Sequence, residues 1–189
     1  DVQGTRMSPE GVITADGFSE AYHQFIESGW NGIGCPSEFG GQGLPEIINT
    51  ATQEMWNSAN MSFALCPLLN TSAIAAISNV GSSEQKALYL PKMISGEWTG
   101  TMNLTESQAG SDLSAVRTRA VLAGDHYRLF GQKIFITWGE HNMTPNTIHL
   151  VLARTPDAPE GVKGISLFIV PKFLVNPDGS LGARNDVHA

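Results

Sequence analysis

The sequence predicts an α+β multidomain protein, in which an N-terminal helical domain precedes a small antiparallel β-barrel or β-sandwich. Two observations carry this prediction. Apolar residues recur at helical spacing in the first half, and short alternating segments rich in β-branched residues fill the second half. A run of helices followed by a run of strands argues against a doubly wound fold, in which the two alternate. The change falls near Gly96, so we place the domains at residues 1–97 and 98–189.

The helical domain should contain several helices separated by glycine or proline signals. Apolar side chains recur at i, i+4, i+7 and i+8 over residues 18–26, after Asp16 as a possible N-cap and before a terminating Gly29. Five glycines and a proline make residues 30–44 an irregular loop. The other expected features are a helix over 45–59 that starts at Pro45, a buried helix over 68–80 capped by Gly81, and a short helix from Ser82 or Ser83 through Leu88 that Pro91 limits or kinks.

The second half should form the β domain. Its segments alternate apolar and polar residues and are separated by turn signals such as residues 123–125. The candidate strands are residues 98–104, 116–122, 127–130, 132–136, 147–154 and 164–171.

The composition is that of an ordinary globular protein, with 41% hydrophobic and 15% charged residues and a formal net charge of −7. An acidic surface repels phosphate backbones, so we expect no nucleic-acid partner. No apolar run approaches the ~20 residues that span a bilayer, so we expect no membrane span. Cys35 and Cys66 form no Cys-x-x-Cys pair, which favours a reducing, cytoplasmic location. The five histidines are scattered without a ligand spacing, so we expect no metal.

Two segments of the β domain could carry chemistry. Residues 102–112 run from a strand into a loop of small polar residues, which can place several donors around a heteroaromatic ring or a phosphate. Taken alone, this segment is more simply an ordinary strand-to-turn transition, in which Thr105, Ser111 and Asp112 satisfy the local backbone. Residues 131–139 are likewise more simply a buried strand with an aromatic partner.

The two segments together resemble the acyl-CoA dehydrogenase family. Residues 105–112 read Thr-Glu-Ser-Gln-Ala-Gly-Ser-Asp and match the family signature Thr-Glu-x-x-Ala-Gly-Ser-Asp. Residues 131–137, Gly-Gln-Lys-Ile-Phe-Ile-Thr, match a second block of the family, and residues 29–43 resemble its N-terminal loop. The tail over residues 171–187 is longer than the usual linker and resembles the branch that contains the bacterial 3-methylmercaptopropionyl-CoA dehydrogenases.

The resemblance implies FAD-dependent α,β-dehydrogenation of an acyl-CoA thioester. Ser111 should contact the thioester arm of the substrate or nearby cofactor atoms. The implied flavin contacts are the backbone of Met102 and Leu104 at the isoalloxazine edge, Thr105 at the pyrimidine side, Phe135 and Ile136 flanking the ring, and Thr137 near N5. Many relatives have Pro in place of Ser107 and Trp in place of Phe135; both departures should modulate the site without abolishing it.

The resemblance also implies partners and a missing catalytic group. It places the catalytic base in a C-terminal helical domain that would follow Ala189, so Glu106 should brace its loop, and this stretch alone should be inactive. The implied partners are the acyl-CoA substrate, electron-transfer flavoprotein or a similar acceptor, and further copies of the full-length chain in a homodimer or homotetramer.

Three alternatives stay open. An acyl-CoA oxidase would share these blocks and pass electrons to oxygen. A non-catalytic β-barrel binding module would keep the architecture without the reaction. A structural subunit that has lost the chemistry is the third, although the presence of Thr105, Ser111 and Thr137 argues against it.

Overall fold

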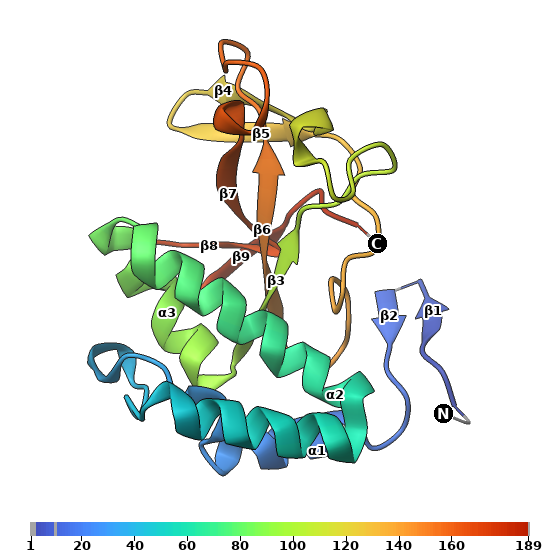
Figure 1. Ribbon diagram of the computed structural model, residues 1–189, viewed down its shortest axis with the longest axis vertical. Coiled ribbons are helices and arrows are strands. Elements are labelled where there is room, and N and C mark those ends of the chain that lie inside the picture. The colour runs from blue at the N-terminus through green and yellow to red at the C-terminus, as the bar shows by residue number, and fades with distance from the viewer. Residues whose placement is uncertain (1–2, 10, 189) are drawn as a thin grey trace.

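Helices and strands occupy separate parts of the molecule. The computed structural model describes residues 3–9 and 11–188. Helices α1 (Phe18–Glu27), α2 (Glu46–Val80) and α3 (Ser83–Ser95) form the lower part in Figure 1, and most strands lie above them. The predicted α+β class with a leading helical part is confirmed, and the change from helix to strand falls between α3 and the strand that begins at Trp98.

Helix α2 is two helices joined at a kink. Asn60 has non-helical backbone angles (φ −159°, ψ 94°), and its side-chain oxygen accepts a hydrogen bond from the amide of Phe63 at 3.1 Å. An asparagine that accepts from the residue three positions later is an N-cap, so the second half starts here. The two separate helices predicted for this region therefore exist, but the second begins earlier than residue 68.

The helix boundaries correct three details of the prediction. Gly17, with φ 85°, holds the N-cap position of α1, so Asp16 is not the cap. Pro45 precedes the first residue of α2. Of the two serines predicted to start α3, Ser82 is the N-cap and forms a capping box with Gln85, and the helix runs past Pro91 to Ser95. The missing proline hydrogen bond is tolerated because Leu90, Met93 and Ile94 around it are buried.

The central sheet has three strands in the order β3–β6–β7: β3 (Trp98–Asn103), β6 (Asn146–Ala153) and β7 (Ser166–Pro171). β6 and β7 are antiparallel, but β3 and β6 are parallel, so this sheet is mixed. Three hairpins complete the β structure: β1 (Arg6–Ser8) with β2 (Gly11–Ile13), β4 (Arg119–Ala123) with β5 (His126–Phe130), and β8 (Phe173–Val175) with β9 (Leu181–Arg184). The described strands form no closed barrel.

One predicted strand is wrong. Residues 132–136 form part of a loop, in which both Phe135 (φ 57°) and Trp138 (φ 55°) have left-handed backbone angles. A strand cannot contain such angles, because they turn the chain out of the extended conformation. The hairpins β1–β2 and β8–β9 were not predicted, because strands of three or four residues are too short to show a period.

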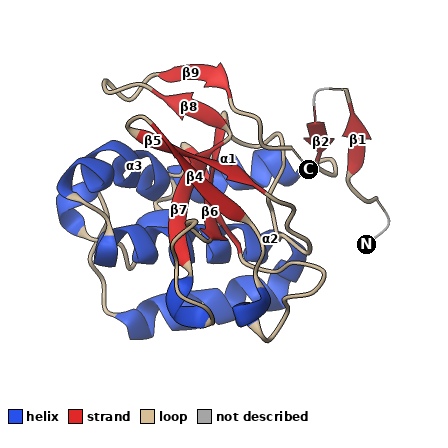
Figure 2. Cartoon of the chain, turned by 90° about the horizontal axis from the view of Figure 1, so that it is seen from above, coloured by secondary structure: helices blue, strands red, loops and turns tan. Residues whose placement is uncertain are grey.

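The core lies between the two longer helices and the sheet. Its fully buried side chains come from α2, α3, β3 and β6, and include Ile74, Ile77, Leu90, Met93, Trp98, Ile148 and Leu150. Gly100 allows the close approach of α2, because a Cβ atom there would lie 2.6 Å from the Cβ of Ala73. In Figure 2, where the molecule is seen from above, strands β4 to β7 are seen in front of helices and the β1–β2 hairpin lies to one side.

Of the helices in the described residues, only α2 is long and apolar enough to cross a membrane by length and composition. This result differs from the expectation that no apolar stretch approaches that length. The second half of α2 buries Cys66, Asn70, Ala73, Ile74 and Ile77 inside the protein, which is typical of a core helix.

Candidate functional site

Two loops carry the residues predicted to form the site. The β3–β4 loop (residues 104–118) follows β3, and the β5–β6 loop (residues 131–145) connects the β4–β5 hairpin to the central sheet. The structure brings the two loops together. The amide of Ile134 donates to the carbonyl of Thr105 at 2.9 Å, and Lys133 Nζ donates to the carbonyl of Leu104 at 3.1 Å. The two sequence blocks are thus neighbours in space.

A third link ties the β5–β6 loop to strand β3. The hydroxyl of Thr101 donates to the carbonyl of Thr137 at 2.7 Å. Because β3 is an edge strand of its sheet, its outer backbone side pairs with no other described strand. Met102 and Leu104, at and just beyond the end of β3, are both partly buried.

The surface formed where the loops meet has free polar groups and an exposed aromatic ring. Neither the hydroxyl of Thr105 nor that of Thr137 makes a hydrogen bond within residues 3–9 and 11–188. Phe135 is 87% exposed and has a left-handed backbone, while Ile136 beside it is partly buried. Left-handed angles in a bulky residue are uncommon and persist only when the surrounding structure imposes them. The loop therefore presents its aromatic ring outward.

Ser111 is not joined to this meeting point by a hydrogen bond among the described residues. It is exposed on the β3–β4 loop, next to Asp112, whose carboxylate accepts from the amide of Ser114 at 2.9 Å and caps a short 3-10 turn. Within the described residues Ser111 makes no hydrogen bond to the β5–β6 loop. Of the predicted site residues, Leu104 and Thr105 lie on a loop that is hydrogen-bonded to the loop of Phe135, Ile136 and Thr137, and Met102 lies on strand β3, whose Thr101 bonds Thr137. Ser111 makes no such bond in the described residues.

Glu106 is a structural carboxylate. Its side chain accepts hydrogen bonds from five donors: Gln108 Nε2, Arg117 N, Thr118 N, Thr118 Oγ1 and Lys133 Nζ. Burial raises the pKa of Glu106, but the hydrogen bonds outweigh it and lower that pKa to about 2. A carboxylate this stable in its ionised form is a poor proton acceptor near neutral pH. The prediction that Glu106 braces its loop is confirmed.

A second buried ion cluster holds the other end of the β5–β6 loop. Lys172 Nζ, just after β7, donates to Glu140 Oε1, and Arg184 Nη2 on β9 lies 3.6 Å from Glu140 Oε2. The Glu140 and Lys172 side chains are 7% and 11% exposed. Sequence reasoning missed this cluster, because Glu140 lies 32 residues before Lys172 and the three residues form no motif.

Two buried histidines lie near this cluster. His141 Nε2 is 2.9 Å from Thr99 Oγ1, and His149 Nδ1 is 3.1 Å from Asn103 Nδ2. Burial, followed by the charge of Lys172, lowers the pKa of each histidine to about 4. Both rings are therefore neutral at pH 7 and act as hydrogen-bonding core residues.

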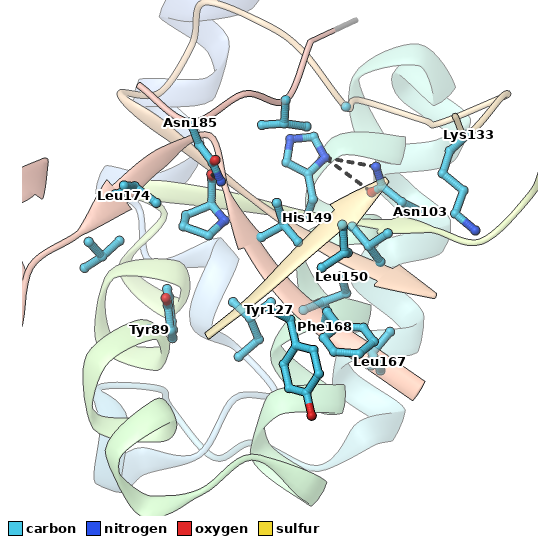
Figure 3. Close-up of a pocket in the computed structure, with 18 of the residues that line it drawn as sticks. Tyr89, Asn103, Tyr127, Lys133, His149, Leu150, Leu167, Phe168, Leu174 and Asn185 are labelled. Carbon is cyan, nitrogen blue, oxygen red and sulfur yellow. Dashed lines mark hydrogen bonds between the residues drawn. The ribbon is translucent and has the colours of Figure 1, made fainter. Parts of the chain in front are cut away.

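A wide groove of about 1930 Å³ opens beside the loops. Figure 3 shows its wall, with the paired Asn103 and His149 at one side and the rings of Tyr127 and Phe168 at another. Ile136 and Thr137 line this groove. The other predicted site residues do not line it, namely Met102, Leu104, Thr105, Ser111 and Phe135. The polar surface where the loops meet thus lies at the border of the groove.

Comparisons with known proteins all point to one family. The model of the acyl-CoA dehydrogenase N-terminal domain matches residues 10–97, and that of the acyl-CoA dehydrogenase middle domain matches residues 101–186. A curated relative, 3-methylmercaptopropionyl-CoA dehydrogenase of Ruegeria pomeroyi, is 54% identical over 98% of this chain and 32% of its own length. The predicted resemblance to that branch is confirmed.

Solved structures agree with the sequence comparison. A chain from the structure of the electron transferring flavoprotein of Acidaminococcus fermentans is 35% identical, with a TM-score of 0.70, over 80% of this chain and 39% of that one. An acyl-CoA dehydrogenase complexed with FAD from Bacillus anthracis is 28% identical, with a TM-score of 0.67, over 82% of this chain and 25% of that one. The chain spans about a third of the curated relative from Ruegeria pomeroyi. It belongs to the acyl-CoA dehydrogenase family and carries the N-terminal and middle domains of that family.

Proposed function

We propose that the full-length protein is an FAD-dependent acyl-CoA dehydrogenase, and that the surface where the β3–β4 and β5–β6 loops meet contacts its flavin. The observation that supports this most is the pair of free threonine hydroxyls, Thr105 and Thr137, held on two hydrogen-bonded loops beside the exposed ring of Phe135. Neither hydroxyl is among the buried polar atoms that lack a partner in the described residues, so both are accessible to a ligand. A flat heteroaromatic ring with polar edges would supply a partner for both hydroxyls and would cover the phenyl ring.

Each residue has a proposed part in holding the cofactor. The Thr105 hydroxyl would bond the pyrimidine side of the flavin and Thr137 the region near N5, while Phe135 and Ile136 flank the ring. The backbone of Met102 and Leu104 would meet its edge, since β3 is an edge strand. A bound FAD would supply the hydride acceptor for the β-carbon of an acyl thioester. This chain would orient that ring and exclude water from one side of it.

Proton removal needs a group other than Glu106. Five hydrogen bonds and a pKa of about 2 keep this carboxylate ionised and occupied. We assign Ser111, exposed on the same loop, to the thioester arm of the substrate. The base that takes the α-proton would then come from a C-terminal helical domain outside residues 1–189, and the isolated stretch should show no turnover.

The physiological setting forms part of the same proposal. The substrate class is an acyl-CoA, the acceptor is electron-transfer flavoprotein or a similar protein, and the full-length chain forms a homodimer or homotetramer. A cytoplasmic location is supported by Cys35 and Cys66, which are both free and buried. The relative from Ruegeria pomeroyi suggests short thioether-containing acyl chains among the first substrates to try.

An anaerobic titration tests this function. The full-length protein, purified with FAD, is mixed with acyl-CoA thioesters of increasing chain length, and the visible absorbance of the flavin is followed. Substrate should bleach that absorbance stoichiometrically. Absence of bound flavin, or no bleaching with any thioester, would overturn the proposal and favour the binding-module or structural-subunit alternative. Faster reoxidation by oxygen than by electron-transfer flavoprotein would instead identify an oxidase.

A further inference from the structure

We propose that Glu106 and Lys133 act as a positioning pair, which sets the register between the two loops that contact the flavin. This inference rests on the proposed function, because it assigns the pair a task at that same surface. Neither side chain is assigned a contact with the cofactor or the substrate. Their contribution would be to place Thr105 and Thr137 at the correct separation.

The pair is a buried bridge between the loops. Lys133 Nζ donates to Glu106 Oε1 at 2.8 Å, and the two side chains are 7% and 5% exposed. The same ammonium donates to the carbonyl of Leu104 at 3.1 Å. One lysine of the β5–β6 loop therefore holds both a backbone atom and a side chain of the β3–β4 loop.

The bridge lies immediately beside the proposed flavin contacts. Glu106 follows Thr105 in the chain, and Lys133 comes four residues before Thr137. Between them, the amide of Ile134 donates to the carbonyl of Thr105. These links join residues 104–106 of one loop to residues 133 and 134 of the other. If one loop shifted by one residue along the other, the ion pair would break. Hydrogen bonds to a cofactor edge require placement within a fraction of an ångström, and such placement depends on the surrounding residues.

The two partners differ in how they are held. Glu106 is anchored within its own loop, since Arg117 N, Thr118 N and Thr118 Oγ1 all donate to it. Lys133 is its only side-chain donor from the other loop among the described residues. Removing the lysine should cut the link between the loops while leaving Glu106 fixed. Removing the Thr118 hydroxyl should weaken the anchoring of Glu106 and leave the link intact.

This difference gives a matched pair of variants. In the full-length protein, Lys133→Met removes the bridge and Thr118→Val removes a donor to the same carboxylate from within the loop. Both positions are buried, so both variants should lower the melting temperature. Only Lys133→Met should weaken FAD binding, by about tenfold or more at a temperature where every variant is folded, as is usual for residues that support a ligand's direct contacts. Thr118→Val should leave the FAD dissociation constant within about twofold of wild type.

A further readout separates positioning from general stability. The visible circular dichroism of bound flavin depends on the placement of the ring, so Lys133→Met should change it and Thr118→Val should not. Lys133→Arg, which keeps the charge and the donors, should restore most of the affinity. If Lys133→Met does not fold, the double variant Glu106→Gln/Lys133→Met replaces it, because it leaves no unpaired buried charge and should show the same loss.

The outcomes are distinct. An FAD affinity within about twofold of wild type, with an unchanged flavin spectrum, in Lys133→Met or in the double variant would overturn the positioning role. An equal loss of affinity in Thr118→Val would also overturn it, since the effect would then follow stability. If the wild-type protein itself takes up no FAD, the proposed function fails, and that result is visible before any variant is compared.

Discussion

The layer between the helices and the sheet is apolar, whereas the interior around the two loops is polar. The first is built from side chains such as Leu90, Met93 and Ile148, and the second from Glu106 and the buried histidines with their partners. Apolar burial is non-directional and tolerates small displacements. Buried polar groups are costly unless each has a partner at the right distance, so they fix the positions of the segments that carry them. The comparison suggests that the apolar layer stabilises the fold, whereas the polar interior fixes the positions of the two loops.

Among variants of the apolar layer, Leu90→Ala should lower the free energy of unfolding the most. Leu90 is fully buried in α3, so Leu90→Ala should lower the free energy of unfolding by about 2–5 kcal/mol in urea denaturation. Val80→Ala, at a position that is 79% exposed, is the control and should change it by less than about 0.5 kcal/mol. The FAD affinity of folded Leu90→Ala should equal that of wild type; a large loss would erase the distinction between the two regions.

The buried histidines predict how stability depends on pH. Burial, followed by the charge of Lys172, lowers the pKa of His141 and His149 from 6.5 to about 4. Each ring therefore binds a proton more readily in the unfolded chain. The stability that each neutral ring contributes is complete above pH 6.5 and is lost as the pH falls toward 4. When the pH falls from 7.5 to 5.0, each histidine should lower the free energy of unfolding by about 2 kcal/mol, as measured by urea denaturation. His149→Gln should remove about half of that slope, and an unchanged slope would show that His149 is not responsible for it.

Gly100 tests the packing of helix α2 against the sheet within the apolar layer. A Cβ atom at this position would lie 2.6 Å from both the Ala73 Cβ and the Met93 Cε, so Gly100→Ala should cost about 1–3 kcal/mol through overpacking. Gly4→Ala, where nothing lies within 4 Å, is the control. Equal melting temperatures for the two variants would show that α2 can move away from the sheet without cost.

The same contrast explains what the sequence could predict. The helices were predicted because apolar burial leaves a period, as over residues 18–26, and because caps such as Ser82 have a side-chain signature. Helix α3 continues past Pro91 because packing of its neighbours outweighs local propensity. Tertiary contacts of this kind cannot be seen in a local pattern.

The sequence of the polar region has no periodic pattern that predicts its structure. The segment over residues 132–136 looks like a strand in sequence, yet contacts with Thr105 and Thr101 hold it as a loop. Family resemblance identified Thr105 and Thr137, but the ion cluster of Glu140, Lys172 and Arg184 forms only when distant segments meet. Specific polar pairing is thus the part of this fold that needed the three-dimensional structure.

The central claim is that the two free hydroxyls contact one flavin. The most direct measurement is the FAD dissociation constant of the full-length Thr105→Val/Thr137→Val variant, with Thr50→Val on the exposed side of α2 as control. Each lost hydrogen bond is worth about 1 kcal/mol, so the double variant should bind FAD about tenfold or more weakly, with a melting temperature close to wild type in the absence of FAD. A dissociation constant equal to that of wild type and of Thr50→Val would contradict the account.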